Sequence, residues 1–425
     1  VGHRIHAEDR IITMKVYLVG GAVRDELLGI PVKERDWCVV GATPDAMIND
    51  GYRPVGKDFP VFLHPETGEE YALARTERKT GTGYHGFSFH TDSGVTIEQD
   101  LERRDLTVNA MARDMDGQLV DPFGGRKDLD ERILRHVSGA FTEDPVRILR
   151  VARFAARFAE LGFSVAGETM AMMQEIVTCG EADALVPDRV WKEAEKALGE
   201  KQPQVFFETL RECGALKIVF PEIDALFGVP QPEKWHPEID CGIHTMMVLE
   251  QAARLSEDID VRFAALVHDL GKATTDKDKL PSHPGHEARS VRLVEAISKR
   301  LPIPSALRDL GKISAEFHTH CHRAFELRPD TILKVLNRTD AFRRPERFQK
   351  FLLSCRADAR GRTGFEEIDY PQADFFRDAF DAARSVDIED LKSGDRDGAD
   401  IGRMIGERRL AAIRQFRKDY EPPPK

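Results

Sequence analysis

The sequence predicts an α+β fold, in which a mixed α/β N-terminal part is followed by an entirely helical remainder. Residues 15–125 contain short apolar runs that end in glycine turns, whereas from Asp144 onward apolar residues recur with helical spacing. The 425 residues also exceed what one ordinary hydrophobic core accommodates, so we expect several domains.

Strands are predicted where short apolar runs end at turn residues. The predicted strands are 15–19, 37–40, 70–74 and 118–120, with a helix over 22–28 that stops at Gly29. Met14 opens the first strand. The polar residues 1–13 lack the apolar segment of a secretory signal, and we interpret them as a non-native or disordered extension outside the fold.

The helical part is predicted to begin at Asp144, a good N-cap, with Pro145 in the first turn and the helix 146–161 ending at Gly162. Further helices are predicted at 187–198, 203–213, 244–255, 261–270, 286–300, 303–320, 373–385 and 402–418. The proline-rich stretch 221–241 is the expected domain boundary, with a softer one near Phe342.

Composition limits the class of protein. Hydrophobic residues make up 41% and charged residues 32%, which is typical of a globular protein, and no apolar run reaches the roughly 18 residues of a membrane helix. Six cysteines without a C-x-x-C pair exclude a zinc ribbon and favour a reducing cytoplasm. The net charge of −11 argues against a surface coated in nucleic acid but permits a local basic groove.

Two N-terminal motifs suggest phosphate and metal binding. Gly20 and Gly21 form a turn between a strand and a helix, where main-chain N–H groups and Arg24 would hold a triphosphate; the alternative is a tight turn with a surface arginine. Glu34 and Asp36 would face the same side of a strand, which suits Mg²⁺, and the alternative is a solvated charge cluster.

Two further motifs combine arginines with hydrogen-bonding side chains. Arg103 and Arg104 precede Asn109, which indicates phosphate and sugar contacts or a salt-bridged helix cap. Asp144 and Arg147 would together hydrogen-bond one base edge, because a carboxylate accepts from an exocyclic amine and a guanidinium donates to ring atoms. The alternative is a capping Asp144 paired with Arg147 within the helix.

These four motifs, in this order, resemble class II tRNA nucleotidyltransferases, the CCA-adding enzymes of the polymerase-β-like superfamily. The resemblance implies a polymerase-β-like head (14–143), an all-α neck (144–225), a helical body (226–342) and a helical tail (343–425). It implies that Gly21 and Arg24 bind triphosphate, and that Glu34 and Asp36 hold Mg²⁺. It also implies that Arg104, Arg150 and Arg153 contact CTP or ATP, and that Asp144 and Arg147 act as an amino-acid template.

Glu34 departs from the family pattern, which has Asp-x-Asp at the metal motif. The extra methylene would move a metal ligand by about 1 Å, and displacements of that size affect rate.

A second set of histidines and carboxylates lies in the C-terminal half. His268-Asp269 ends a predicted helix, and imidazole and carboxylate ligands on several helices suit a transition metal that activates water. The candidate ligands are His244, His268, Asp269, His286, His318 and Asp340, whereas His283, His320 and His322 are interpreted as ordinary core or surface histidines.

This stretch resembles the HD phosphohydrolase superfamily, which within CCA-adding enzymes marks the multifunctional bacterial subgroup. The resemblance implies 2′,3′-cyclic phosphodiesterase, 2′-nucleotidase and phosphatase activities with a metal such as Ni²⁺. The implied partners are tRNA, CTP and ATP, with no membrane, in a cytoplasmic monomer or homodimer. Three alternatives stay open: a poly(A) polymerase, an HD phosphohydrolase with an inactive RNA-binding head, and a non-catalytic RNA chaperone.

Overall fold

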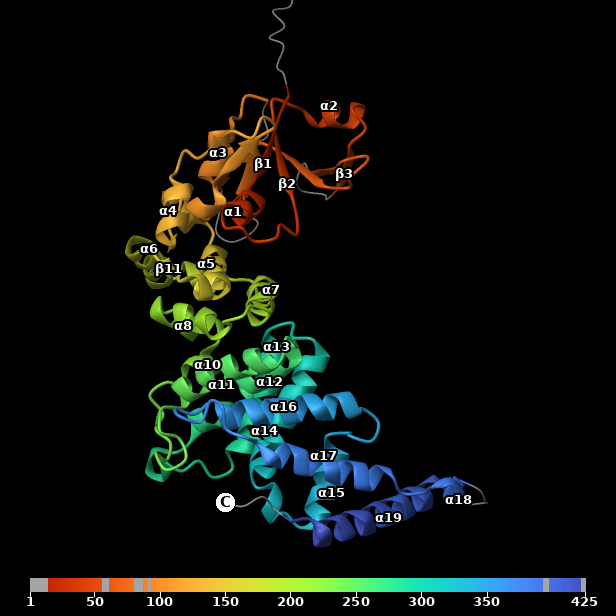
Figure 1. Ribbon diagram of the computed structural model, residues 1–425. Helices are drawn as coiled ribbons and strands as arrows, with labels where there is room; N and C mark the ends of the chain where they lie inside the picture. The colour runs from red at the N-terminus through yellow and green to blue at the C-terminus, as the bar shows by residue number, and fades with distance from the viewer. Residues whose placement is uncertain (1–13, 56–60, 80–86, 91–92, 393–396, 422–425) are drawn as a thin grey trace, which may run out of the picture. The chain divides into compact units, whose positions relative to one another are not determined.

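The computed structural model describes residues 14–55, 61–79, 87–90, 93–392 and 397–421 (Figure 1). The chain forms two compact units, residues 1–186 and 187–425. Every strand described lies in the first unit and the second is helical, so the predicted α+β class is confirmed. The predicted extension 1–13 lies outside the described residues.

A seven-stranded sheet, in the order β3-β4-β5-β2-β1-β8-β9, forms the scaffold of the first unit. Strand β2 runs antiparallel to β1 and parallel to β5. The strands are β1 (Lys15–Val19), β2 (Asp36–Val40), β3 (Arg53–Val55), β4 (Val61–Leu63), β5 (Glu70–Leu73), β8 (Ala112–Asp114) and β9 (Leu119–Val120), with the separate pairs β6 (Thr76–Lys79) and β7 (Phe87–His90), and β10 (Ile133–Leu134) and β11 (Ser164–Val165).

Strand β2 is covered on both faces, because successive side chains of a strand point to opposite sides. Cys38 packs with Leu101 of α3, whereas Val39 packs with Met47 of α2. This burial fixes the strand whose first residue is Asp36. The helices of the unit are α1 (Gly21–Leu27), α2 (Pro44–Asn49), α3 (Ile97–Glu102), α4 (Gly125–Glu131), α5 (Val146–Phe158) and α6 (Gly167–Thr178).

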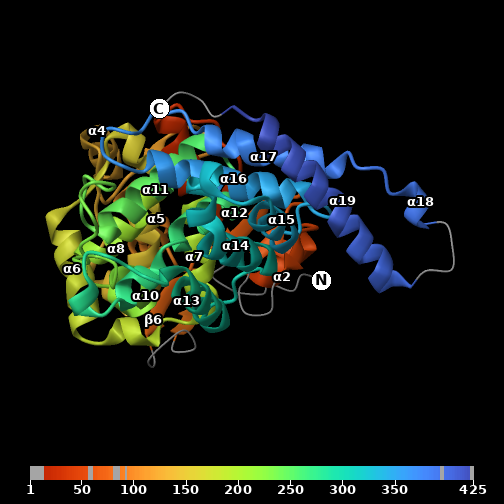
Figure 2. The ribbon, with the colours of Figure 1, turned by 90° about the horizontal axis from the view of Figure 1, so that it is seen from below.

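Helices α11, α12, α14 and α16 pack against one another in the second unit (Figure 1 and Figure 2). Its helices are α7 (Pro187–Leu198), α8 (Gln204–Glu212), α9 (Leu216–Val219), α10 (Pro221–Asp224), α11 (Cys241–Leu255), α12 (Ile259–Val267), α13 (His286–Arg300), α14 (Ser305–His322), α15 (Pro329–Arg338), α16 (Pro345–Arg360), α17 (Pro371–Arg384), α18 (Glu389–Lys392) and α19 (Gly398–Asp419). Among the described residues, none of these helices has the length and hydropathy to cross a bilayer.

The predicted helices 187–198 and 286–300 coincide with α7 and α13, whereas α6, α15 and α16 were not predicted. The division between the two compact units falls after residue 186 of the chain, inside the predicted neck. The division into head, neck, body and tail therefore stays a prediction.

Candidate functional sites

The glycine turn and the metal motif meet at one edge of the sheet. Val19, the last residue of β1, pairs with Asp36, and Asp36 pairs on its other side with Glu70 of β5. Gly20 follows directly, with φ +68° and ψ −124°, and a Cβ there would lie 2.6 Å from Arg104 Nη1. Only glycine adopts this backbone conformation without strain, and the absence of a side chain lets Arg104 lie close to the main chain of the turn.

A cavity of about 240 Å³ opens at this edge and is lined in part by Asp36, Glu70, Asp100 and Arg104. Arg104 is oriented by a hydrogen bond from its Nη2 to Asp100 Oδ2, 3.2 Å away. Desolvation raises the pKa of the Asp36 carboxyl, Arg104 opposes this shift, and Glu34 reinforces it. A bound cation would favour the ionised carboxylate, which fits a metal ligand.

Glu34 lies in the loop before β2, since that strand begins only at Asp36. It is exposed and lines a neighbouring cavity together with Asp36 and Glu70. The alternation of side chains along a strand, on which the prediction was based, therefore does not determine where the Glu34 side chain points. Glu70 is a carboxylate that sequence reasoning missed, because only the pairing of β2 with β5 places it beside Asp36.

Arg24 is placed differently from the prediction that it reaches a triphosphate. Its side chain is 2% exposed, and it donates hydrogen bonds from Nε to Asp25 Oδ1 and from Nη1 to Asn109 Oδ1. Its guanidinium also lies over the rings of Phe154 and Phe158. In this structure Arg24 supports the glycine turn from within the fold.

Asp144 and Arg147 stand at the start of α5. Asp144 accepts a hydrogen bond from the Val146 N–H, 3.1 Å away, as an end cap does. Arg147 is 8% exposed and donates to the carbonyls of Ala140 and Arg103, at 3.0 and 2.6 Å. Arg147 thereby connects the fourth motif to the third.

A polar network links three of the four sequence motifs. Asp105 accepts from Arg150 Nε at 2.6 Å and from Asn109 Nδ2 at 3.2 Å, while Asn109 accepts from Arg24. Burial would raise the pKa of Asp105, but Arg150 and Asn109 outweigh it and lower the pKa to about 2. Arg153 lies close to this network, over the Phe154 ring at 4.4 Å. The network holds two of the predicted nucleotide-binding arginines, Arg24 and Arg150, in place.

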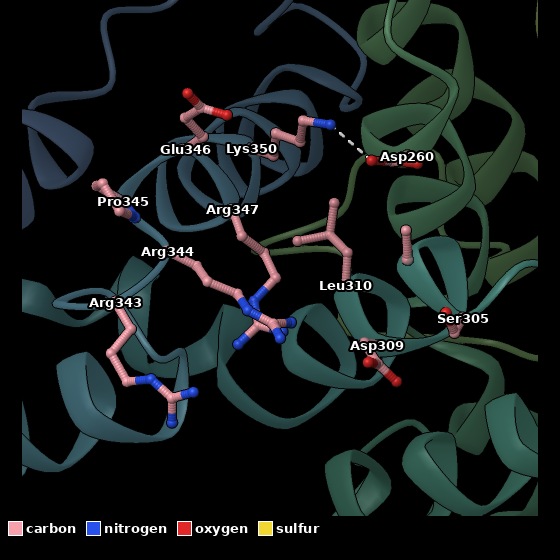
Figure 3. A pocket seen from close by; sticks show the side chains of 11 residues that line it. Asp260, Ser305, Asp309, Leu310, Arg343, Arg344, Pro345, Glu346, Arg347 and Lys350 are labelled. Carbon is pink, nitrogen blue, oxygen red and sulfur yellow. Dashed lines mark hydrogen bonds and ion pairs between the residues drawn. The ribbon is translucent and has the colours of Figure 1, made fainter.

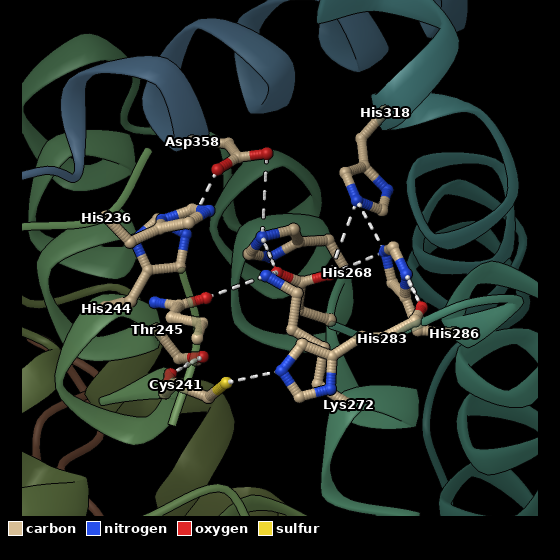
Figure 4. Close-up of polar contacts among 12 residues, drawn as sticks. His236, Cys241, His244, Thr245, His268, Lys272, His283, His286, His318 and Asp358 are labelled. Carbon is tan, nitrogen blue, oxygen red and sulfur yellow. Dashed lines mark hydrogen bonds and ion pairs between the residues drawn. The ribbon is translucent and has the colours of Figure 1, made fainter. Parts of the chain in front are cut away.

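The second site is a buried cluster of histidines and carboxylates (Figure 4). Three groups of ligand atoms among the described residues each lie within 4.8 Å of one another, and two of them form the centre of the cluster, while the third consists of His236, Glu238 and His244. Of the two central groups, one consists of His244, His268 and Asp358, and the other of Asp269, His286 and His318. The predicted histidines thus come together from α11, α13 and α14 and from the end of α12.

Hydrogen bonds to main-chain oxygens orient the imidazole rings. His268 Nδ1 is 2.7 Å from the Ala265 carbonyl oxygen, His286 Nδ1 is 2.9 Å from that of His283, and His318 Nδ1 is 2.9 Å from that of Ser314. Each carbonyl can only accept, so Nδ1 carries the proton and Nε2 is left for a metal.

The cluster fits a divalent transition metal by its chemistry. His268 Nε2 and Asp269 Oδ1 are buried and have no hydrogen-bond partner among the described residues. Burial would lower the pKa of His268, but Asp269 and Asp358 outweigh it and raise the pKa to about 10. The carboxylates of the cluster attract a cation, which would take the place of the proton on His268 Nε2. The ligand atoms lie 3.2 Å apart in the pairs His268 Nε2–Asp269 Oδ2 and His286 Nε2–Asp269 Oδ1, and such buried nitrogen and oxygen atoms suit a metal.

Asp340 does not belong to this cluster, which corrects the prediction. Asp340 lies 3.5–3.8 Å from Arg343, Arg344 and Arg347. The second carboxylate of the cluster, besides Asp269, is Asp358 of α16, whose Oδ2 is 3.6 Å from His268 Nε2 and whose Oδ1 is 3.1 Å from His244 Nε2. A sequence signal for Asp358 exists, since it is a carboxylate on the helical face that buries Phe351 and Cys355.

His322 also departs from the prediction of an ordinary histidine. Its Nε2 is 2.6 Å from Asp358 Oδ2, and its Nδ1 is 2.9 Å from the Tyr370 hydroxyl. Glu238, which sequence reasoning missed, lies 3.0 Å from His244 Nδ1 and 3.1 Å from His236 Nδ1. These contacts hold the side chains of His244 and Asp358 in their orientations within the cluster.

Family models match three stretches of the chain: the poly A polymerase head domain at 16–135, a probable RNA and SrmB-binding site of polymerase A at 162–227, and the HD domain at 242–344. A multifunctional CCA protein of Thioalkalivibrio sulfidiphilus is 64% identical over 96% of this chain and all of its own length. One of Alkalilimnicola ehrlichii is 58% identical over 96% of this chain and 99% of its own.

The fold resembles the Thermotoga maritima CCA-adding enzyme complexed with tRNA, with a TM-score of 0.62 at 20% identity over 96% of this chain and 88% of that one. Fold and sites together define a nucleotidyltransferase head joined to an HD-type helical body. The chain belongs to the family of multifunctional CCA proteins, which confirms the family predicted from its motifs.

Proposed function

We propose that this protein adds the 3′-terminal CCA sequence to tRNA from CTP and ATP without a nucleic-acid template, releasing pyrophosphate. The observation that carries the proposal is the meeting of the Gly20 turn, Asp36 and Arg104 at one edge of the sheet. Relatives at 56–64% identity, named multifunctional CCA proteins, support it.

The proposed reaction is attack of the RNA 3′-hydroxyl on the α-phosphorus, which forms the new P–O bond as the bond to pyrophosphate breaks. Mg²⁺ held by Glu34 and Asp36 would supply activation of the hydroxyl and neutralisation of the leaving charge. The main chain of Gly20 and Gly21 admits the phosphates closely, and Arg104 faces them beside Asp36. Asp144 and Arg147 would read the base edge after exchanging their present main-chain partners.

The second proposed activity is hydrolysis of 2′,3′-cyclic phosphates, 2′-nucleotides and phosphate monoesters at the histidine–aspartate cluster. His244, His268, Asp269 and Asp358 would hold a transition metal such as Ni²⁺, which activates water. Lys272, whose Nζ is 2.6 Å from Asp269 Oδ2, keeps that carboxylate ionised.

An arginine cluster in the second unit is proposed to contact the RNA backbone. Arg343, Arg344 and Arg347 line a cavity of about 530 Å³ at the start of α16 (Figure 3). The three guanidinium groups share Asp340. The carboxylates of the cavity lining are Asp260 and Asp309, which pair with Lys350 and Arg308, and Glu346. Because three guanidinium groups share one carboxylate, part of their positive charge is available to bind phosphate groups.

The test is incubation with tRNA lacking CCA, Mg²⁺, and CTP alone, ATP alone or both, with products resolved by length. Two additions with CTP, and a third only when ATP is present, are expected. Long adenosine tails would instead identify a poly(A) polymerase. Absence of any addition, with phosphohydrolysis intact, would reduce the head to an RNA-binding module.

A further inference from the structure

Trp235 is a large exposed aromatic side chain at the cavity that holds the histidine–aspartate cluster. It is 58% exposed, although tryptophan has more apolar surface to bury than any other residue. The cavity measures about 520 Å³, and its lining includes Trp235 together with Asp269, His286, His318 and Asp358. Cavities of this size accommodate small organic ligands, whereas a phosphate group alone occupies a small part of such a volume.

The loop that carries Trp235 is fixed in place. Its ends are closed by an antiparallel bridge between Pro230 and Asp240, and the next residue, His236, packs its ring against His244 at 4.6 Å. Arg362 donates a hydrogen bond from Nη1 to the Trp235 carbonyl, 3.4 Å away. A supported loop therefore holds Trp235 in the lining of the cavity, with Lys234 Nζ 4.6 Å from the centroid of its ring.

Positive charge accompanies the aromatic surface. Arg362 lines the cavity, donates to the carbonyls of Ala359 and Trp235, and forms no ion pair within the described part of the chain. Its guanidinium also lies over the Phe365 ring at 4.9 Å. An aromatic face together with an uncompensated arginine suits a ligand that has both a nucleobase and a phosphate.

We propose that Trp235 stacks on the nucleobase of the substrate whose phosphate lies at the histidine–aspartate cluster, with Arg362 facing that phosphate. The site then selects the nucleotide end of an RNA, or a free nucleotide, over other phosphate monoesters. This inference rests on the proposed phosphohydrolase function and adds to it a residue that recognises the base of the substrate.

The kinetic test compares 2′-AMP with glycerol 2-phosphate, a secondary phosphate monoester without a base, on the nickel-loaded full-length protein. Trp235→Ala is expected to raise KM for 2′-AMP roughly tenfold and to leave glycerol 2-phosphate hydrolysis and nickel content unchanged. Trp235→Phe should retain most of the affinity. The matched control is Ile243→Ala, an exposed apolar residue of α11 that is not part of the cavity lining.

Tryptophan fluorescence in EDTA gives a readout that needs no metal. 2′-AMP, but not glycerol 2-phosphate, is expected to quench the wild-type protein and not Trp235→Phe. Equal quenching in both proteins, or equal loss of both substrates in Trp235→Ala, would overturn the stacking role. If the wild type hydrolyses neither substrate, the phosphohydrolase proposal fails, while the fluorescence still decides whether Trp235 binds a base.

Discussion

Single residues determine the geometry of the two sites, and Glu34 in the first unit is the clearest example. It stands where the family pattern has aspartate, in a loop rather than on the predicted strand. Because the side chain is exposed, its length is free to change without a cost in packing. Asp36, by contrast, is fixed by pairing on both sides of β2.

Glu34→Asp is expected to preserve or raise the rate of CTP addition, because the shorter side chain restores the spacing of the family's metal motif. The measurement is kcat/KM for CTP on tRNA lacking CCA, titrated with Mg²⁺. A large fall in turnover would show that the loop geometry is built around glutamate. Asp36→Asn serves as the inactive reference.

For the proposed metal site, Asp358 is the residue to be tested and Asp340 is its matched control. Asp358→Asn is expected to reduce nickel content and to lower 2′-AMP hydrolysis at least about 100-fold, because it removes the carboxylate beside His268 and His244. Asp340→Asn should change neither quantity. Unchanged circular dichroism and an unchanged unfolding temperature of both variants verify folding, and equal effects of the two changes would contradict the assignment.

Among the elements, helix α16 carries residues of both the arginine cluster and the histidine–aspartate cluster. Its first turn carries Arg347 next to Arg343 and Arg344, and its last turns carry Asp358. Phe348, a fully buried residue on the same helix, anchors it in the core. Although α16 follows the predicted boundary near Phe342, it packs on α11, α12 and α14.

The double change Arg343→Ala and Arg344→Ala is expected to weaken the binding of different tRNAs to a similar extent. The slope of the logarithm of the binding constant against the logarithm of the salt concentration should become shallower by about one for each phosphate contact that is lost. Stability should change little, because both side chains are largely exposed and lie 3.6–3.8 Å from Asp340. Binding is measured by fluorescence anisotropy across a salt series. Arg338→Ala, an exposed arginine outside the cavity, is the control, and an equal loss there would exclude a specific contact.

The whole molecule contains two separate centres in two compact units. Asp36 belongs to the unit 1–186, and His268 to the unit 187–425. Each centre has its own candidate ligands within its own unit: carboxylates at the sheet edge in one, and histidines with carboxylates between helices in the other. Two independent activities are therefore expected from one chain.

His268→Ala is expected to abolish phosphohydrolysis and leave CTP and ATP addition intact, while Asp36→Asn should do the reverse. Both activities are measured on the same preparations, with tRNA lacking CCA and with 2′-AMP. Joint loss in either variant, in a protein with unchanged circular dichroism, would contradict the two-centre description.

The α+β order, helices such as α7 and α13, and candidate histidines that the structure brings together were predictable from the sequence, because turn glycines, caps and apolar spacing are local signals. Tertiary structure decided what local signals do not carry. Strand pairing placed Glu70 beside Asp36, burial turned Arg24 inward, and the packing of α16 brought Asp358 to the histidines in place of Asp340. Each of these results depends on contacts between residues far apart in the chain.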